Sequence, residues 1–396
     1  MRTWLNQLAA VTAMNLRNLP GRIGTSLVAV IGIGGVVAVL VSLLAMGEGF
    51  RAALDLSGRD DVVLVLRGGS ADELSSAFGR EEVNVIASAP GILVDAQGPV
   101  ASPEFYTIVD LPMRSTGTSA NVPFRGVTAR GAQVREGFRL VAGRMFVPGR
   151  NEVIVGRGAL AQFGEVELGR DVVWGSQSWR VVGVFEAGGS VSESEVWADL
   201  TVLQGVYRRG NSVQVVRARL ESTQSLGAVK GWLAADPRVN ATVRTEREFY
   251  ADQSRVLITL IRYVGGAIAV LMGVGAVFAA LNTMYSAVSS RTREIATLRA
   301  LGFGAAPVVA SVLIEALVLG LLGGVAGGAL VYLALNGNQA STLNWASFSQ
   351  ITFAFTVTRE LLVTGVVYAL VLGFAGGLLP ALRAARMPVT AGLREL

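Results

Sequence analysis

The chain of 396 residues contains no cysteine and no histidine, and Lys230 is the only lysine among its 34 basic residues. Without cysteine it has no disulfide bonds or thiol chemistry, and without histidine it has no imidazole for a metal site or for acid-base catalysis. A serine hydrolase triad without histidine is uncommon. Lys230 is not part of a G-x-x-x-x-G-K-[ST] nucleotide-binding loop. The acidic residues do not have the spacing of a calcium loop, and the glycine-rich runs lie inside the apolar runs, so they are not dinucleotide-binding fingerprints. We therefore expect no catalytic, metal or cofactor site in this chain.

Charged residues are also scarce, at 16% of the chain against 52% hydrophobic residues, which is typical of a membrane-embedded protein. A helix needs about 20 apolar residues to cross a bilayer. Four runs reach or approach this length, and Glu315 is the only charged residue within them. These runs are Thr25–Met46, Val264–Leu281 (extendable through Ser290), Ala305–Leu335 and Leu361–Leu379. The first run is too long, and begins too late, for a cleaved signal peptide, so we interpret it as a retained span.

The distribution of arginines predicts the orientation of these spans. Before the first span, between the second and third, and after the fourth, nine arginines face only two acidic residues, Glu294 and Glu395. The nine are Arg2, Arg17, Arg22, Arg291, Arg293, Arg299, Arg383, Arg386 and Arg394. In contrast, the insert Glu48–Arg255 holds 23 basic and 25 acidic residues, and Asn336–Thr358 holds no charge. We expect both termini to be cytoplasmic and the insert to face outward. The pI near 9.9 then reflects this bias and indicates no nucleic-acid partner.

The 208-residue insert alternates strand-like and helix-like stretches between glycine turns, which predicts an α+β domain with its own core. Its last three elements form a β-α-β unit that can pair with the first strands, and the middle region has β character. We predict strands at Val62–Arg67, Glu104–Asp110, Val122–Ala129, Asn151–Val155, Asp171–Trp174, Trp179–Phe185, Ser212–Leu220 and Val239–Val243, and helices at Glu81–Ser88, Leu200–Tyr207 and Gln224–Ala234. Thr245–Arg255 is predicted to continue as a helix into the second span.

The polar stretch Ser290–Gly302 interrupts the apolar C-terminal half. It predicts a short amphipathic helix, with Ser290 as N-cap, Gly302 as a left-handed C-cap, and Arg291 able to pair with Glu294. Ile295, Leu298 and Leu301 recur at helical spacing. A docking helix for a cytoplasmic partner and a plain charged hairpin loop both fit this pattern. Residues Met1–Leu19 similarly fit a helix along the inner membrane surface, with Trp4, Leu8 and Val11 near one face, or a frayed tail.

The third and fourth spans carry several glycine pairs at the four-residue spacing that allows helix backbones to approach closely. The glycines are Gly320, Gly323, Gly324, Gly327 and Gly328, with Gly373 and Gly377 in the fourth span. Glu315 lies ~15 Å along the third span from its cytoplasmic end. An intramembrane carboxylate indicates function by default, and we favour structural pairing over proton coupling because no second acid lies within the spans.

Two stretches, VSSRTREIATLRALG (Val288–Gly302) and VLIEALVLGLLGGVAGG (Val312–Gly328), resemble the signature of the MacB/FtsX-like, or type VII, ABC transporter permeases. Asn15–Leu54 and the tail Pro380–Leu396 are also similar to that family. The resemblance implies four transmembrane helices and an extracytoplasmic α+β domain, in which a porter-like subdomain carries an inserted β-rich subdomain. It assigns docking on an ATPase to Arg291, Arg293, Glu294, Ile295, Leu298 and Arg299, and it places an acidic residue at Glu315.

The same resemblance implies partners. These are two copies of an ABC ATPase that binds ATP and Mg²⁺, a second permease copy (a homodimer, with a heterodimer as the alternative), membrane lipid and, in some members, a periplasmic adaptor. The expected role is mechanotransmission in a bacterial inner membrane, where ATP hydrolysis moves the outward domain to export a substrate. A lipoprotein-release permease and an FtsX-like activator of a cell-wall hydrolase are the alternatives, and a partner of an antibiotic sensor fits the span number less well.

Together these inferences predict an ordered series of segments. In sequence numbers they are a cytoplasmic amphipathic helix (1–23), the first span (24–47), the extracytoplasmic domain with stalks (48–255, with the β-rich insertion at about 120–208), the second span (256–289), the coupling helix (290–304), the third span (305–335), an outer loop (336–358), the fourth span (359–380) and a cytoplasmic tail (381–396).

Overall fold

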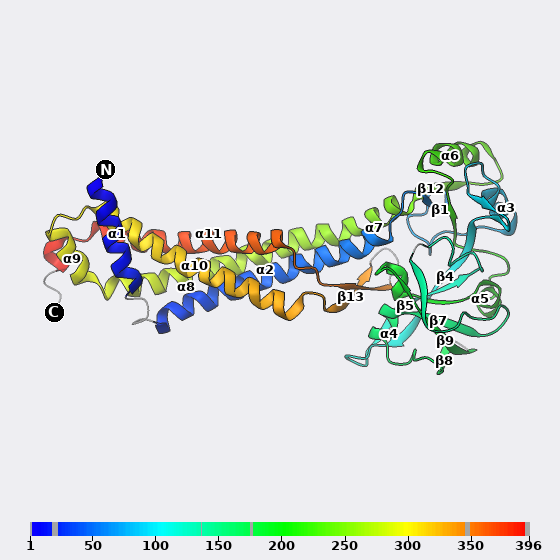
Figure 1. Ribbon diagram of the computed structural model, residues 1–396, viewed down its shortest axis with the longest axis horizontal. Coiled ribbons are helices and arrows are strands. Elements are labelled where there is room, and N and C mark those ends of the chain that lie inside the picture. Colours follow the sequence, from blue (N-terminus) through cyan, green and yellow to red (C-terminus); the bar gives the residue numbers. More distant parts are fainter. Residues whose placement is uncertain (1, 18–22, 136, 175–176, 345–348, 393–396) are drawn as a thin grey trace. The chain divides into compact units, whose positions relative to one another are not determined.

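The computed structural model describes residues 2–17, 23–135, 137–174, 177–344 and 349–392, and the chain divides into two compact units (Figure 1). The first unit, which we call the bundle, consists of residues 1–48, 260–338 and 355–396. The second, the α/β domain, consists of residues 49–259 and 339–354. Each is described separately.

Within the described residues, four helical segments are long and apolar enough to cross a membrane, as the sequence predicts. They are Ile23–Ser57 (α2), Glu246–Ser289, Ala305–Leu335 (α10) and Arg359–Arg386 (α11). The second is continuous, as expected, and is composed of α7 (Glu246–Leu260), one π-helical turn (Ile261–Gly265) and α8 (Gly266–Ser289). The remaining helices of the bundle are α1 (Arg2–Arg17), α9 (Thr292–Ala300) and α12 (Val389–Gly392).

Glycines let α10 approach two neighbouring helices closely. Gly323 and Gly327 lie against the backbone of α2 at Gly34, where a Cβ on Gly327 would come within 2.3 Å of the Gly34 carbonyl oxygen. Gly320 and Gly324 instead face α11, and a Cβ on Gly320 would lie 2.8 Å from the Ala369 carbonyl oxygen. Gly328 faces the side chain of Leu362, and Gly373 and Gly377 of α11 face Ala316. The overlapping spacing therefore serves two different helix contacts within this chain.

The α/β domain contains one ten-stranded sheet with the order β12-β1-β11-β4-β5-β10-β7-β9-β6, and β8 pairs with β9. Its strands are β1 (Val62–Arg67), β4 (Ala101–Pro112), β5 (Ser119–Val127), β6 (Phe138–Gly143), β7 (Glu152–Gly156), β8 (Asp171–Trp174), β9 (Gln177–Ala187), β10 (Val196–Asp199), β11 (Val215–Arg219) and β12 (Ala241–Thr245). A short ribbon joins β2 (Val94–Asp95) to β3 (Gly98–Pro99). The helices are α3 (Arg80–Ala87), α4 (Arg157–Gln162), α5 (Leu200–Val206) and α6 (Leu226–Ala235), with 3-10 turns at Val191–Ser194 and Thr223–Ser225.

The predicted β-α-β unit is confirmed, with one strand between its two strands. β11 and β12 are connected through α6, and both pair antiparallel to β1, which lies between them. The 12-residue strand β4 then connects this layer to the β-rich region, because its start pairs with β11 and the rest pairs with β5. The residues from β5 to α5, close to the predicted insertion, are therefore continuous with the same sheet, and both parts share one apolar core.

The segment predicted as an uncharged outer loop forms a hairpin of β13 (Gln339–Asn344) and β14 (Ser349–Ala354). It belongs to the α/β domain. The Phe353 ring contacts Phe50 edge to face at 6.0 Å, and the Thr352 amide donates to Ser194 Oγ at 2.8 Å. The turn at 345–348 lies outside the described residues. The docking of the hairpin has no local sequence signal, because Ser194 lies 158 residues before Thr352 in the chain.

The hairpin makes the stability of the isolated domain testable. We expect residues 48–255 alone to be soluble and to unfold cooperatively, but at a lower temperature than the same fragment with residues 339–354 attached through a flexible linker. Burying the Phe353 side chain, which is 3% exposed, is worth about 1.5–3 kcal/mol. Scanning calorimetry of both fragments measures the difference, and equal melting temperatures would show that the hairpin contributes nothing.

Candidate functional site

The turn between α8 and α9 connects several helices of the bundle through polar contacts. α8 ends at Ser289, and Arg291 occupies the position before α9 begins at Thr292. Glu294 in the first turn and Arg299 in the last complement the helix dipole. Gly302 follows with φ of +93°, so it adopts the predicted left-handed conformation. The proposed N-cap was wrong: Ser290 is the C-cap of α8 and Arg291 occupies the N-cap position.

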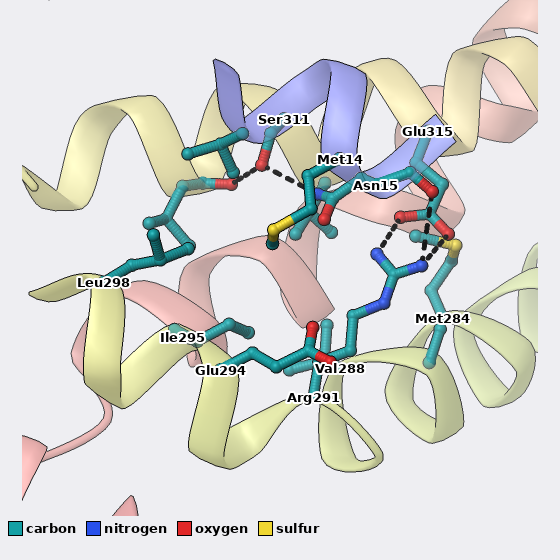
Figure 2. Close-up of a pocket in the computed structure, with 14 residues that line it drawn as sticks. Met14, Asn15, Met284, Val288, Arg291, Glu294, Ile295, Leu298, Ser311 and Glu315 are labelled. Atoms are coloured by element: carbon teal, nitrogen blue, oxygen red, sulfur yellow. Dashed lines mark hydrogen bonds and ion pairs between the residues drawn. The ribbon is translucent and has the colours of Figure 1, made fainter. Parts of the chain in front are cut away.

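Arg291 forms a buried ion pair with Glu315 of α10 (Figure 2). Arg291 Nη1 donates to Glu315 Oε2 at 2.9 Å and Nη2 donates to Oε1 at 3.5 Å, and each side chain is only 5% exposed. This pair takes the place of the predicted pairing of Arg291 with Glu294. A glutamate inside a bundle needs a charged partner, and Arg291 supplies it from 24 residues earlier in the sequence.

The N-terminal helix α1 joins the same network. Arg291 Nη2 also donates to the Asn15 carbonyl oxygen at 3.4 Å, and Asn15 Nδ2 donates to Ser311 Oγ of α10 at 3.1 Å. Val11 and Asn15 are buried on the face of α1 that packs on α10. The predicted helix is therefore present and has a buried face. The side chain of Trp4 lies outside the described residues.

The residues predicted to dock on a partner fall into two sets. Ile295 is buried in the core formed by α8, α9, α10 and α11, and Leu298 is partly buried at its edge. Arg299 Nη1 donates to the carbonyl oxygens of Ala385 and Met387 at 2.7 and 2.8 Å, where α11 ends. With Arg291, these side chains face the bundle and hold α9 in place.

The residues of the second set are exposed. Arg293 and Glu294 are exposed, and so is Leu301, with 72% of its surface accessible. Leu301 therefore does not share the buried face of Ile295, contrary to the helical spacing on which its prediction depended, because the helix ends at Ala300. Arg293 therefore lies on the exposed side of α9, whereas Glu294 is exposed at the edge of the small cavity beside Arg291.

The cavity beside Arg291 excludes one role for this region. It has a volume of about 20 Å³ and is lined by Met14, Met284, Arg291, Leu298, Glu315 and nearby residues (Figure 2). That space holds about one water molecule. The arrangement is therefore a structural junction of α1, α8, α9 and α10, with no room for a small-molecule substrate.

A second charged cluster, which the sequence analysis did not identify, lies in the core of the α/β domain. We call it the ion cluster; its members are buried and comprise Glu73, Glu104, Glu195, Glu246, Arg125, Arg135 and Arg217. Arg125 is central, with bonds to Glu73 at 2.7 Å, Glu104 at 2.9 Å and Glu195 at 2.8 Å. Arg135 donates to both oxygens of Glu104, and Arg217 pairs with Glu246 and donates to Tyr250.

Charge balance determines the protonation of the ion cluster. Among the residues that the structure describes, its four glutamates face three arginines. Burial raises the pKa of Glu104, but the guanidiniums of Arg135 and Arg125 outweigh it and hold the pKa at about 2. At Glu246 burial dominates over the attraction of Arg217 and raises the pKa to about 7. Protonated Glu246 leaves three carboxylates opposite three guanidiniums, so we assign the extra proton to this residue.

The raised pKa predicts a pH dependence of domain stability. The folded pKa of Glu246 exceeds its ordinary value of 4.5, so its stabilising protonation is complete below pH 4.5 and is lost as the pH rises through about 7. The full effect is at most about 3 kcal/mol. Because the chain has no histidine, no other side chain titrates there at its ordinary pKa. We expect the melting temperature of the isolated α/β domain to fall from pH 5 to pH 8, and Glu246→Gln to abolish this slope. Glu248→Gln, on the exposed side of α7, is the control and should retain it.

Two known protein-family models match this chain. The C-terminal domain of FtsX-like permeases matches residues 266–389, and the MacB-like periplasmic core domain matches residues 26–235, more than half of the chain. The chain belongs to the MacB/FtsX-like family of ABC transporter permeases. The family resemblance identified from the α9 region is thereby confirmed.

Similar proteins carry related names. The chain is 29% identical to macrolide export ATP-binding/permease protein MacB 1/2 of Paracoccus denitrificans, over 99% of this chain and 59% of that protein. It is 27% identical to MacB 1 of Aeromonas hydrophila, over 91% and 56%, and 27% identical to MacB of Bordetella avium, over 100% and 62%. The chain thus spans a little over half the length of these relatives.

Similar solved structures cover only part of this permease. The periplasmic region of MacB from Actinobacillus actinomycetemcomitans is 13% identical with a TM-score of 0.37, covering 48% of this chain and 92% of that one. The extracellular domain of the noncanonic ABC-type transporter YknZ from Gram-positive bacteria is 18% identical with a TM-score of 0.35, covering 46% and 100%.

Proposed function

We propose that this permease is the membrane subunit of an ABC exporter, and that it couples ATP hydrolysis by a separate ATPase to movement of its α/β domain. The observation that carries the proposal is the division of α9 into two faces. Arg291, Ile295 and Arg299 fix one face of α9 to the bundle, while the side chains of Arg293 and Glu294 remain exposed to a partner. The names of the relatives, which pair ATP binding with macrolide export, support an ATP-driven export role.

The proposed orientation follows the arginine distribution. The α9 side of the bundle and both termini face the cytoplasm of a bacterium, and the α/β domain lies outside the inner membrane. Two ATPase subunits, which bind ATP and Mg²⁺, dock on α9 of two permease copies in a homodimer. A substrate gathered by the α/β domain, with an adaptor where one is present, then needs no passage between the spans.

The contacts of α9 provide a route for force. A push on α9 reaches α10 through the Arg291–Glu315 pair and the end of α11 through Arg299. The turn that holds Arg291 directly follows α8, which continues without interruption through the π-helical turn to α7. Glu246, the buried carboxyl of the ion cluster, is the first residue of α7. We propose that movement of α8 and α7 reaches the α/β domain along this continuous segment.

Charge changes at the exposed residues of α9 test the docking function. Glu294→Arg places three positive charges within one turn, so we expect it to reduce copurification of the ATPase by about tenfold, or ~1.4 kcal/mol. Leu298→Pro should abolish copurification, because proline costs about 3 kcal/mol or more within a helix. Both variants should retain wild-type membrane abundance.

Arg17→Glu provides a control, since Arg17 is an exposed arginine at the end of α1 and is not part of α9. It should bind the ATPase normally. Unchanged binding by Glu294→Arg and Leu298→Pro would instead support a plain loop and would refute the coupling role.

A further inference from the structure

A second, larger cavity opens on the bundle surface between the end of α8, the start of α9 and the end of α11. Its volume is about 570 Å³. Arg383 and Arg386 line it together with Tyr285, Ser289, Leu379 and Leu382. We call it the basic groove. It is separate from the small cavity beside Arg291, and the docking proposal does not use it.

The polar end of the groove is suited to an anion. Arg383 lies over the Tyr285 ring at 5.5 Å, which leaves its guanidinium donors available, and Arg386 is exposed one helical turn further on. The lining residues, all within the described part of the chain, include no carboxylate. Ser289 adds an exposed hydroxyl, whereas the Thr292 hydroxyl is already donated to the Ser289 carbonyl oxygen. Two guanidiniums without a carboxylate favour a phosphate ligand.

The other end of the groove is apolar and continues along the spans. Leu379 and Leu382 are 53% and 36% exposed at its rim. Further along the same helices, Phe374 of α11 and Phe278 of α8 are 46% and 67% exposed. A soluble protein partner cannot reach a surface that lies within the hydrocarbon region, but an acyl chain occupies it by default. The ligand that fits both ends is therefore an amphiphile with an anionic phosphate.

We propose that the basic groove binds the headgroup of an anionic phospholipid, with the phosphate on Arg383 and Arg386 and an acyl chain against Leu379 and Leu382. The inference depends on the proposed orientation, which places the groove at the inner membrane face, where anionic lipids attract basic residues. A lipid held there contacts the start of α9 and the end of α11, the two elements that Arg299 joins.

Native mass spectrometry of the full-length protein in detergent tests the proposal. The probes are phosphatidylglycerol, zwitterionic phosphatidylethanolamine of the same acyl composition, and inorganic phosphate. We expect wild type to retain phosphatidylglycerol preferentially and Arg383→Gln/Arg386→Gln to bind it roughly 30-fold more weakly, about fivefold for each arginine. Inorganic phosphate should compete poorly, because it makes no apolar contact; strong competition would identify a free phosphate site and overturn the lipid assignment.

Arg293→Gln is the matched control, because Arg293 is an exposed arginine of α9 that does not line the groove. It should retain lipid binding and weaken ATPase copurification. Arg383→Gln/Arg386→Gln should weaken lipid binding and retain ATPase copurification. Normal ATPase copurification by Arg293→Gln would contradict the docking proposal alone. Equal lipid binding by wild type and the double variant would refute the lipid site. A double variant that lost ATPase copurification but retained lipid would also refute it and would identify the groove as a protein contact.

Discussion

Replacing Arg125 with leucine is expected to unfold the α/β domain at room temperature or to leave it only marginally stable. Arg125 is 1% exposed and carries five hydrogen bonds to Glu73, Glu104 and Glu195. Breaking one buried ion pair costs about 3–5 kcal/mol, because the remaining charge is left without a partner. Here three carboxylates lose the same partner, and the whole stability of a domain is only about 5–15 kcal/mol. Near-UV circular dichroism and thermal melting of the domain measure the effect.

A surface pair and a compensating variant separate charge from packing. Arg139→Leu removes a cation whose side chain is 73% exposed beside Glu186, and it should cost at most about 1 kcal/mol. Adding Glu195→Gln and Glu73→Gln to Arg125→Leu removes two of the unpaired charges and should restore part of the stability. If Arg125→Leu melted like wild type, or if the added glutamines gave no recovery, buried charge would not be what stabilises this core.

Glu315→Leu is expected to produce the largest loss of stability in the bundle. The substitution leaves the Arg291 guanidinium buried without its carboxylate, a loss of about 3–5 kcal/mol. Glu315→Gln keeps a hydrogen-bond acceptor for Arg291 and should be the milder change. Arg291→Leu combined with Glu315→Leu removes both charges and should recover much of the lost stability. Thermal stability and monodisperse yield in detergent provide the measurement.

Glu360→Leu is the control for this series, because Glu360 is exposed in the first turn of α11. It should leave the yield unchanged. An undiminished Glu315→Leu protein would show that the ion pair does not hold α9 to α10. If instead transport fell equally in the Gln and Leu variants and varied with the proton gradient, Glu315 would act in proton coupling.

The sequence by itself determined the elements whose signal is local and periodic. In lipid, the backbone polar groups of a long apolar run must form hydrogen bonds with one another, and a helix does this. All four apolar runs are present as helices long enough to span a membrane. Val62–Arg67 and Asp171–Trp174 were predicted at their observed bounds because alternating or continuous β-branched residues lie between turn residues. The stretches VSSRTREIATLRALG and VLIEALVLGLLGGVAGG indicated the family that the family models confirm.

Only the tertiary structure decided which polar residues meet. Arg291 and Glu315 were each noted, but their pairing depends on how α9 folds back on α10, and helical spacing pointed to Glu294 instead. The ion cluster left a weaker signal, single charges inside apolar strands such as Arg217 in VVRAR. The order of the sheet brings β11, β4 and β5 side by side, and loops and α7 add the other members. The docking of the hairpin β13–β14 on Ser194 and Phe50 had no local signal. Contacts between residues far apart in the sequence depend on how the whole unit packs. A buried charge or backbone polar group is stabilised only by the partner that the fold places beside it.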